Sequence, residues 1–135
     1  MGIEIERRFL VENEGWKDQV IRSESFSQAY LNSSVDEWAT RVRIVDNNKG
    51  YITLKSSLNG LVNYEFEYSI PKNDAEQLIQ LSNNYVIHKD RYYEPMGKHT
   101  WEIDVFYGEN KGLVIAEIEL ENEREQIELP DWIYR

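Results

Sequence analysis

The sequence predicts an all-β fold with minor helices (α+β), built from eight antiparallel strands in one domain spanning residues 1–135. Apolar and polar residues alternate along eight segments, as they do in strands with one buried face. These segments are rich in β-branched and aromatic residues, and short turns join most of them, which requires antiparallel pairing. The expected strands are residues 2–11, 24–31, 37–45, 50–57, 62–70, 85–94, 99–107 and 112–121.

Glycine, asparagine and proline mark the turns between neighbouring strands. Asn59-Gly60 is the strongest signal, because this dipeptide favours the two-residue turn of a β-hairpin. Three further turns are predicted at residues 46–50, 95–97 and 108–112. The chain therefore reads as a succession of hairpins, without the long crossovers that parallel strands need.

Two stretches are predicted to be helical, residues 13–21 and residues 74–83. The second follows Pro71 and a capping Asn73, and its apolar residues recur at helical spacing. Eight antiparallel strands fit either a sandwich or a closed barrel. We favour a closed eight-stranded antiparallel β-barrel flanked by these helices, because closure removes both sheet edges. The interior of such a barrel holds packed side chains or one small ligand.

Composition narrows the function classes. The chain has no cysteine, which excludes disulfides, thiolate metal sites and a cysteine nucleophile and fits a cytoplasmic location. Twenty-five acidic against fifteen basic residues give a net charge of −10, which argues against a duplex nucleic acid partner. We expect no membrane partner either, because no apolar run approaches the roughly 20 residues that span a bilayer.

Same-sign charged residues recur two positions apart, so the two members of each doublet share one face of their strand. The six doublets are Glu4/Glu6, Arg41/Arg43, Glu65/Glu67, Lys89/Arg91, Glu102/Asp104 and Glu117/Glu119. Arg8 and Lys55 fall on the same faces of their strands. One doublet alone is typical of a solvated face, but a solvated face that favours stability usually mixes the signs.

Six doublets together indicate charged ligands of both signs. Carboxylate clusters suit a hard divalent cation such as Mg²⁺ or Mn²⁺, and arginine and lysine clusters suit phosphate oxygens. This combination is what a metal–polyphosphate complex requires. It predicts that the charged faces line the lumen of the barrel and that the apolar faces point outward. Two helices cannot cover those outer faces, which include Trp38, Phe66, Trp101 and Ile103, so we expect a homodimer.

The opening stretch EIERRFLV, with Glu4, Glu6 and Arg8, resembles the ExExK signature of CYTH-domain proteins, the triphosphate tunnel metalloenzymes, and most of all their bacterial branch. Further matching pieces follow in the family's order: QAYL, RVRI, TLK, EFEYSI, HKDRYY, WEIDVF and GLVIAEIELE. The resemblance covers nearly the whole chain. It implies an eight-stranded tunnel with a charged lumen and Mg²⁺- or Mn²⁺-dependent chemistry on triphosphates.

The resemblance also implies roles by position. The catalytic residues would be Arg8, Glu117 and Glu119, with one of the two glutamates orienting or deprotonating the attacking water. The substrate-binding residues would be Arg8, Arg41, Arg43, Lys55, Lys89 and Arg91. The metal ligands would be Glu4, Glu6, Glu117 and Glu119, with Glu65, Glu67, Glu102 and Asp104 serving a second metal.

Two features depart from the family pattern. Arg8 stands where the signature has lysine, which keeps the charge and adds a fork but removes a tunable proton donor. Family members continue beyond the stretch Pro130-Asp131-Trp132, whereas this sequence stops at Arg135. We expect either a truncated form or a tunnel that is open at one end.

Inorganic tripolyphosphate is the preferred substrate, because nothing in the sequence marks a pocket for a base. The alternatives are another triphosphate, as in a thiamine triphosphatase, and an adenylate cyclase that forms cyclic AMP from ATP. A module that binds polyphosphate or nucleotide without turnover is a non-enzyme alternative. A barrel with a packed apolar interior and no ligand is the plainest one.

Overall fold

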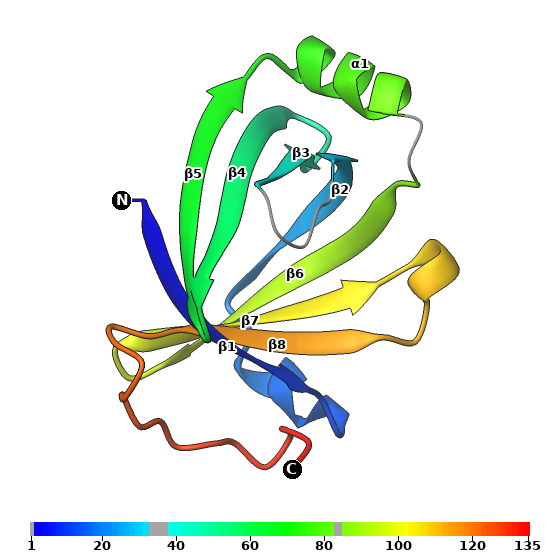
Figure 1. Cartoon of the computed structure of the whole chain (residues 1–135). Helices are drawn as coiled ribbons and strands as arrows, with labels where there is room; N and C mark the ends of the chain where they lie inside the picture. The colour runs from blue at the N-terminus through cyan, green and yellow to red at the C-terminus, as the bar shows by residue number, and fades with distance from the viewer. Residues whose placement is uncertain (1, 33–37, 83–84) are drawn as a thin grey trace.

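The computed structural model describes residues 2–32, 38–82 and 85–135. The strands in these ranges are β1 (Ile3–Leu10), β2 (Arg22–Asn32), β3 (Ala39–Val45), β4 (Lys49–Asn59), β5 (Val62–Ile70), β6 (Ile87–Met96), β7 (His99–Phe106) and β8 (Val114–Glu119). They close into an antiparallel barrel in the order β1-β5-β4-β3-β2-β6-β7-β8 (Figure 1). The closed barrel is thus confirmed over the sandwich.

Three short helices accompany the strands: η1 (Glu14–Gln19), α1 (Lys72–Ser82) and η2 (Gly108–Asn110). Both expected helices are present, the first as a 3₁₀ helix capped by the Asn13 side chain, which accepts from the Gly15 N–H. Residue 37 of the expected third strand and residue 83 of the expected second helix lie outside the described residues. Within the described ranges, no helix combines the length and the apolar character needed to cross a membrane.

Local chemistry explains the hairpin that sets the register of β4 and β5. Gly60 adopts a φ of 44°, in the left-handed region that glycine reaches without steric cost. The turn pairs Asn59 with Val62 and, after a register shift, brings Lys55 opposite Glu65. A basic and an acidic side chain thereby meet on the same face of neighbouring strands.

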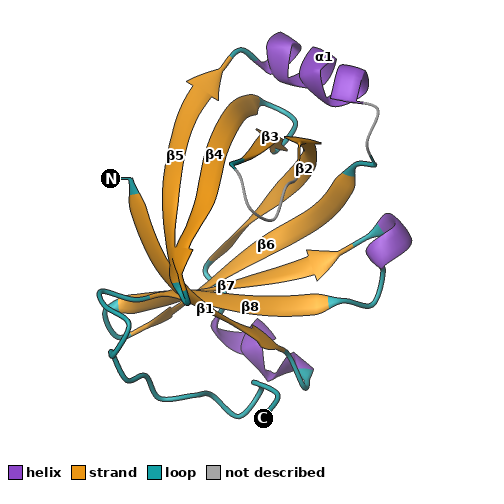
Figure 2. Ribbon diagram, viewed as in Figure 1, coloured by secondary structure: helices purple, strands orange, loops and turns teal. Residues whose placement is uncertain are grey.

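The principal apolar core lies outside the barrel, on the face of β7 and β8 opposite to their carboxylates. It consists of Trp16, Trp101, Ile103, Ala116, Ile118, Leu120, Trp132 and Ile133. Figure 2 shows η1 and the C-terminal coil running along this side of the barrel. A smaller core forms where Ala75 of α1 packs near Val42 and Ile44 of β3.

The expectation that four outer-face residues need a covering partner is wrong for two of them. Trp101 and Ile103 are fully buried, because Trp16 and the C-terminal residues Trp132 and Ile133 pack over β7. Trp38 and Phe66 remain 43% and 39% exposed. The sequence pattern did not assign the C-terminal coil to this role, because coil carries no hydrophobic period that would reveal its buried side.

Candidate active site

All fourteen charged residues singled out from the sequence line one cavity of about 520 Å³ inside the barrel. They are Glu4, Glu6, Arg8, Arg41, Arg43, Lys55, Glu65, Glu67, Lys89, Arg91, Glu102, Asp104, Glu117 and Glu119. The pleat of each strand explains this, since residues i and i+2 point to the same side. The prediction that the doublets face the lumen is therefore confirmed, and the alternative of a packed apolar interior is excluded.

The order of the strands sorts these residues by sign. The strands β4, β3, β2 and β6 are neighbours, and they carry Lys55, Arg41, Arg43, Lys89 and Arg91. We call these four strands the basic arc. The strands β7, β8, β1 and β5 form the other half of the barrel and carry all eight candidate carboxylates together with Arg8. We call this half the acidic arc.

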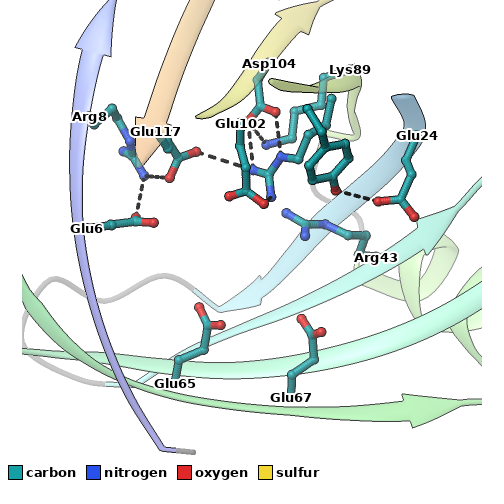
Figure 3. A network of polar contacts seen from close by, with 12 residues as sticks. Glu6, Arg8, Glu24, Arg43, Glu65, Glu67, Lys89, Glu102, Asp104 and Glu117 are labelled. Atoms are coloured by element: carbon teal, nitrogen blue, oxygen red, sulfur yellow. Dashed lines mark hydrogen bonds and ion pairs between the residues drawn. The ribbon is translucent and has the colours of Figure 1, made fainter. Parts of the chain in front are cut away.

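Asp104 joins the two arcs at the seam between β6 and β7. Its carboxylate is 1% exposed and accepts from Lys89 Nζ at 2.6 Å and from Arg91 Nε at 2.8 Å, with Arg91 Nη2 at 3.0 Å from the second oxygen (Figure 3). Burial alone would raise the pKa of Asp104, but these two cations lower it. Burial and the nearby Arg91 and Arg43 lower the pKa of Lys89 to about 8 against the pull of Asp104.

A pair of carboxyl groups dominates the acidic arc. Arg8 Nη2 lies 3.5 Å from Glu6 Oε1 and 3.4 Å from Glu117 Oε2. Burial, followed by the charge of Glu117, raises the pKa of Glu6 to about 8. Burial also opposes the charge of Glu117, but Arg91 and Arg8 outweigh it and lower the pKa of Glu117. Glu6 therefore holds its proton more tightly than an ordinary carboxyl group, whereas Glu117 favours its ionised form.

A second mixed cluster lies at the seam between β4 and β5. Lys55 Nζ is 2.8 Å from Glu4 Oε1, 3.6 Å from Glu6 Oε1 and 3.7 Å from Glu65 Oε2. Burial and then the neighbouring Glu4 raise the pKa of Glu65 to about 7. Figure 3 shows Glu65 and Glu67 extending from their strand toward the network on the opposite side.

Several uncharged or isolated lumen residues escaped the sequence analysis. Phe26 and Gln28 of β2 line the cavity, and so does Tyr93 of β6, whose hydroxyl donates to Glu24. Thr53 accepts from Arg41 and donates to Glu67. A search for same-sign doublets cannot find such residues, but their alternation with outward-facing neighbours was a signal for the lumen face.

The carboxylates fit a hard cation in type but are not gathered on one point. In the part of the chain that the structure describes, no group of three or more acidic or histidine side chains is close enough to hold a metal ion. The carboxyl groups meet instead in small sets cross-linked by Arg8, Lys55 and Arg91. The metal roles of the eight predicted residues stay predictions.

Comparison with known protein families shows to which family the chain belongs. The family model of the CYTH domain matches residues 2–135. The chain belongs to the CYTH domain family. An inorganic triphosphatase of Acetivibrio thermocellus is 41% identical over 136 residues, covering 100% of this chain and 85% of that protein. An inorganic triphosphatase of Nitrosomonas europaea is 32% identical over 122 residues, covering 89% and 78%.

The fold of this CYTH domain has relatives among solved structures. The crystal structure of the inorganic triphosphatase NE1496 aligns with a TM-score of 0.67 at 28% identity, covering 96% of this chain and 86% of that one. The predicted resemblance and the predicted barrel are therefore both confirmed.

Proposed function

We propose that the protein is a metal-dependent triphosphatase whose preferred substrate is inorganic tripolyphosphate. The observation that carries the proposal is the division of one 520 Å³ cavity into a basic and an acidic arc. A chain of phosphates and a divalent cation need these two surfaces at once. The names of the two curated relatives support the same activity.

The basic arc holds the phosphates in this proposal. Arg41, Arg43, Lys55, Lys89 and Arg91 present charge-assisted donors to phosphoryl oxygens, and their placement on neighbouring strands favours a linear anion. Arg8 reaches in from the acidic arc, where it stands beside Glu6 and Glu117. It would bind the phosphate that lies nearest the carboxylates.

The acidic arc supplies oxygen ligands of the kind that Mg²⁺ and Mn²⁺ prefer. Glu4, Glu6, Glu65, Glu67, Glu102, Glu117 and Glu119 are the residues that would hold the ion. Asp104 fits least well, because both of its oxygens already accept from Lys89 and Arg91. A bound cation neutralises charge that develops on the phosphoryl oxygens during hydrolysis.

Glu117 is the residue best suited to orient the attacking water. Its pKa is lowered, so it is ionised at neutral pH, and it lies on the acidic arc within reach of both Arg8 and Arg91. An ionised carboxylate accepts a hydrogen bond from water and polarises it toward phosphorus. Glu119, one side-chain step along the same strand face, is the second candidate.

One assay tests the proposal against its alternatives. The protein is incubated with tripolyphosphate, thiamine triphosphate or ATP, each with Mg²⁺ or Mn²⁺ and with excess chelator. We expect orthophosphate and pyrophosphate from tripolyphosphate, only when metal is present. Cyclic AMP from ATP would indicate a cyclase, preferred cleavage of thiamine triphosphate would change the substrate, and binding without products would indicate a module without turnover.

We propose that the protein forms a homodimer through its outer surface beside β3 and β5, because this surface exposes aromatic side chains. Trp38 stacks with Tyr64 and packs at a tilt against Phe66, each at a ring-centroid distance of 6.1 Å, and Tyr68 is also exposed. A contiguous aromatic surface of this kind is typical of an interface. Sedimentation of wild type and of Trp38→Ser would detect a dimer that this substitution weakens. A single domain over residues 1–135 and a cytoplasmic location stay predictions.

A further inference from the structure

Arg43 differs from the other basic residues of the lumen. Arg8, Arg41, Lys55, Lys89 and Arg91 each lie within 4.0 Å of a carboxylate oxygen. Arg43 has no such ion pair among the described residues, although its side chain is buried. Its Nε donates instead to the neutral Gln28 Oε1 at 2.7 Å.

Phe26 supplies the second neutral contact. The Arg43 Cζ atom lies 4.1 Å from the centroid of its ring, Arg91 Cζ lies 5.0 Å away and Lys89 Nζ lies 5.7 Å away. Phe26 is 3% exposed. One ring therefore faces three cations, and its quadrupole attracts them without adding a negative charge.

The position of β2 in the barrel explains how one strand serves both basic doublets. It pairs with β3 on one edge and with β6 on the other, so that Gln28 lies opposite Arg43 and Phe26 lies opposite Lys89. Like charges packed this closely repel, and burial together with Arg41 and Arg91 lowers the pKa of Arg43. Arg41 Nε, nearby, is buried without an acceptor among the described residues. A buried donor that lacks an acceptor in this region favours an anion as the ligand.

We propose that Phe26 and Gln28 are positioning residues that hold the Arg43 guanidinium without a carboxylate in ion-pair contact, so that this part of the basic arc binds a phosphate group of a linear polyphosphate without metal. The inference deepens the proposed triphosphatase function and rests on it. Phosphate must displace a carboxylate to bind at Lys89 or Arg91, whereas at Arg43 it displaces none. Binding of phosphate at Arg43 therefore breaks no ion pair.

Calorimetric titration of tripolyphosphate in excess chelator tests the proposal. Phe26→Leu keeps an apolar side chain but removes the ring, and we expect it to weaken metal-free binding by about tenfold, which equals about 1.4 kcal/mol. Phe26→Tyr keeps the ring and should restore binding to within about threefold of wild type. Phe106→Leu is the matched control, because in the described part of the chain that lumen ring faces one cation, Lys89 at 5.4 Å, and its loss should change binding less than twofold.

Gln28→Glu is the complementary variant if Phe26→Leu fails to fold. It is nearly isosteric and places a carboxylate on Arg43, so metal-free binding should fall by about tenfold or more while thermal unfolding is little changed. In turnover assays both variants should raise KM and leave kcat within about twofold, because they act before the chemical step.

Three results would overturn the inference: no binding of tripolyphosphate by wild type in chelator, equal losses in Phe26→Leu and Phe106→Leu, or undiminished binding by Gln28→Glu. A different result would refute the proposed triphosphatase function and leave this inference standing. Wild type that binds tripolyphosphate in chelator, loses this binding in Gln28→Glu, and yet forms no products with metal would uphold the positioning role and refute the triphosphatase.

Discussion

The two arcs of the lumen are built in opposite ways. In the acidic arc, carboxyl groups crowd one another, and burial followed by the charge of neighbouring glutamates raises the pKa values of Glu6 and Glu65. In the basic arc, the cations are spaced by neutral groups, with Phe26 and Gln28 between the doublets of β3 and β6. A bound cation would therefore stabilise the acidic arc by offsetting the charge of its carboxylates. The basic arc can bind an anion without such compensation.

The largest effect is expected from Glu117→Gln, which removes the ionised carboxylate that would orient water. Turnover of tripolyphosphate should fall by about 10²–10⁴-fold, the usual contribution of general acid–base catalysis. Phosphate release at saturating substrate measures it. The matched control is Glu121→Gln, at an exposed acid paired with Lys98 outside the lumen, which should keep full turnover. Equal activities in the two variants would remove Glu117 from the chemistry.

Asp104→Asn should have the largest effect on stability, because it breaks the seam between the arcs. Lys89 and Arg91 would lose the buried carboxylate that they share, and breaking such a pair costs about 3–5 kcal/mol. Urea unfolding of the metal-free protein measures the loss. Asp90→Asn on the neighbouring strand β6, which removes only a surface partner of Tyr107, should cost less than about 1 kcal/mol. A loss of stability of similar size in both variants would contradict the claim that Asp104 holds the two arcs together.

Glu6→Gln tests the cost of ionising a buried carboxyl group among the other carboxylates of the acidic arc, through the pH dependence of stability. The pKa of Glu6 is raised to about 8, so the stability that its protonated form contributes is lost as pH rises through 8. Glutamine does not ionise, so Glu6→Gln does not lose this stability as the pH rises. The stability of Glu6→Gln relative to wild type, without metal, should therefore increase between about pH 6 and pH 9 by roughly 1–3 kcal/mol.

Unfolding at the two pH values measures this difference and cancels titrations that both proteins share, such as that of Lys89 in the opposite sense. Glu76→Gln on the exposed face of α1 is the control and should show no increase. If wild type and Glu6→Gln respond identically to pH, ionising Glu6 in the folded protein carries no such cost.

The smallest effect is expected at Arg8, which among the described residues is the one lysine or arginine of the acidic arc that lines the cavity. Its side chain is 58% exposed and its ion pairs are long, at 3.4 and 3.5 Å. Arg8→Lys restores the signature residue and should change the affinity for tripolyphosphate by less than about 1 kcal/mol, as for other exposed pairs. Calorimetry with metal present measures it. A loss of 3 kcal/mol would instead make Arg8 a principal phosphate clamp.

The sequence predicted the walls of this site but not its division into arcs. Alternation fixes which residues share a face, and the recurrence of same-sign doublets predicted that the face with Arg41, Glu65 and Glu117 lines the lumen. The arcs depend on strand order, which places β2 between β3 and β6 although their basic doublets lie far apart in the chain. Phe26 and Gln28 carry no charge, so a search for charged patterns passes over them.

The most direct test of the two arcs is a crossed pair of titrations on Glu6→Gln and Arg43→Met. Mn²⁺ binding is followed by electron paramagnetic resonance without substrate, and tripolyphosphate binding is followed by calorimetry in chelator. We predict that Glu6→Gln weakens Mn²⁺ binding by about tenfold and leaves tripolyphosphate binding within about twofold, and that Arg43→Met does the reverse. Parallel losses of both ligands in both variants, or no loss in either, would contradict the division of the lumen into a metal-binding and a phosphate-binding half.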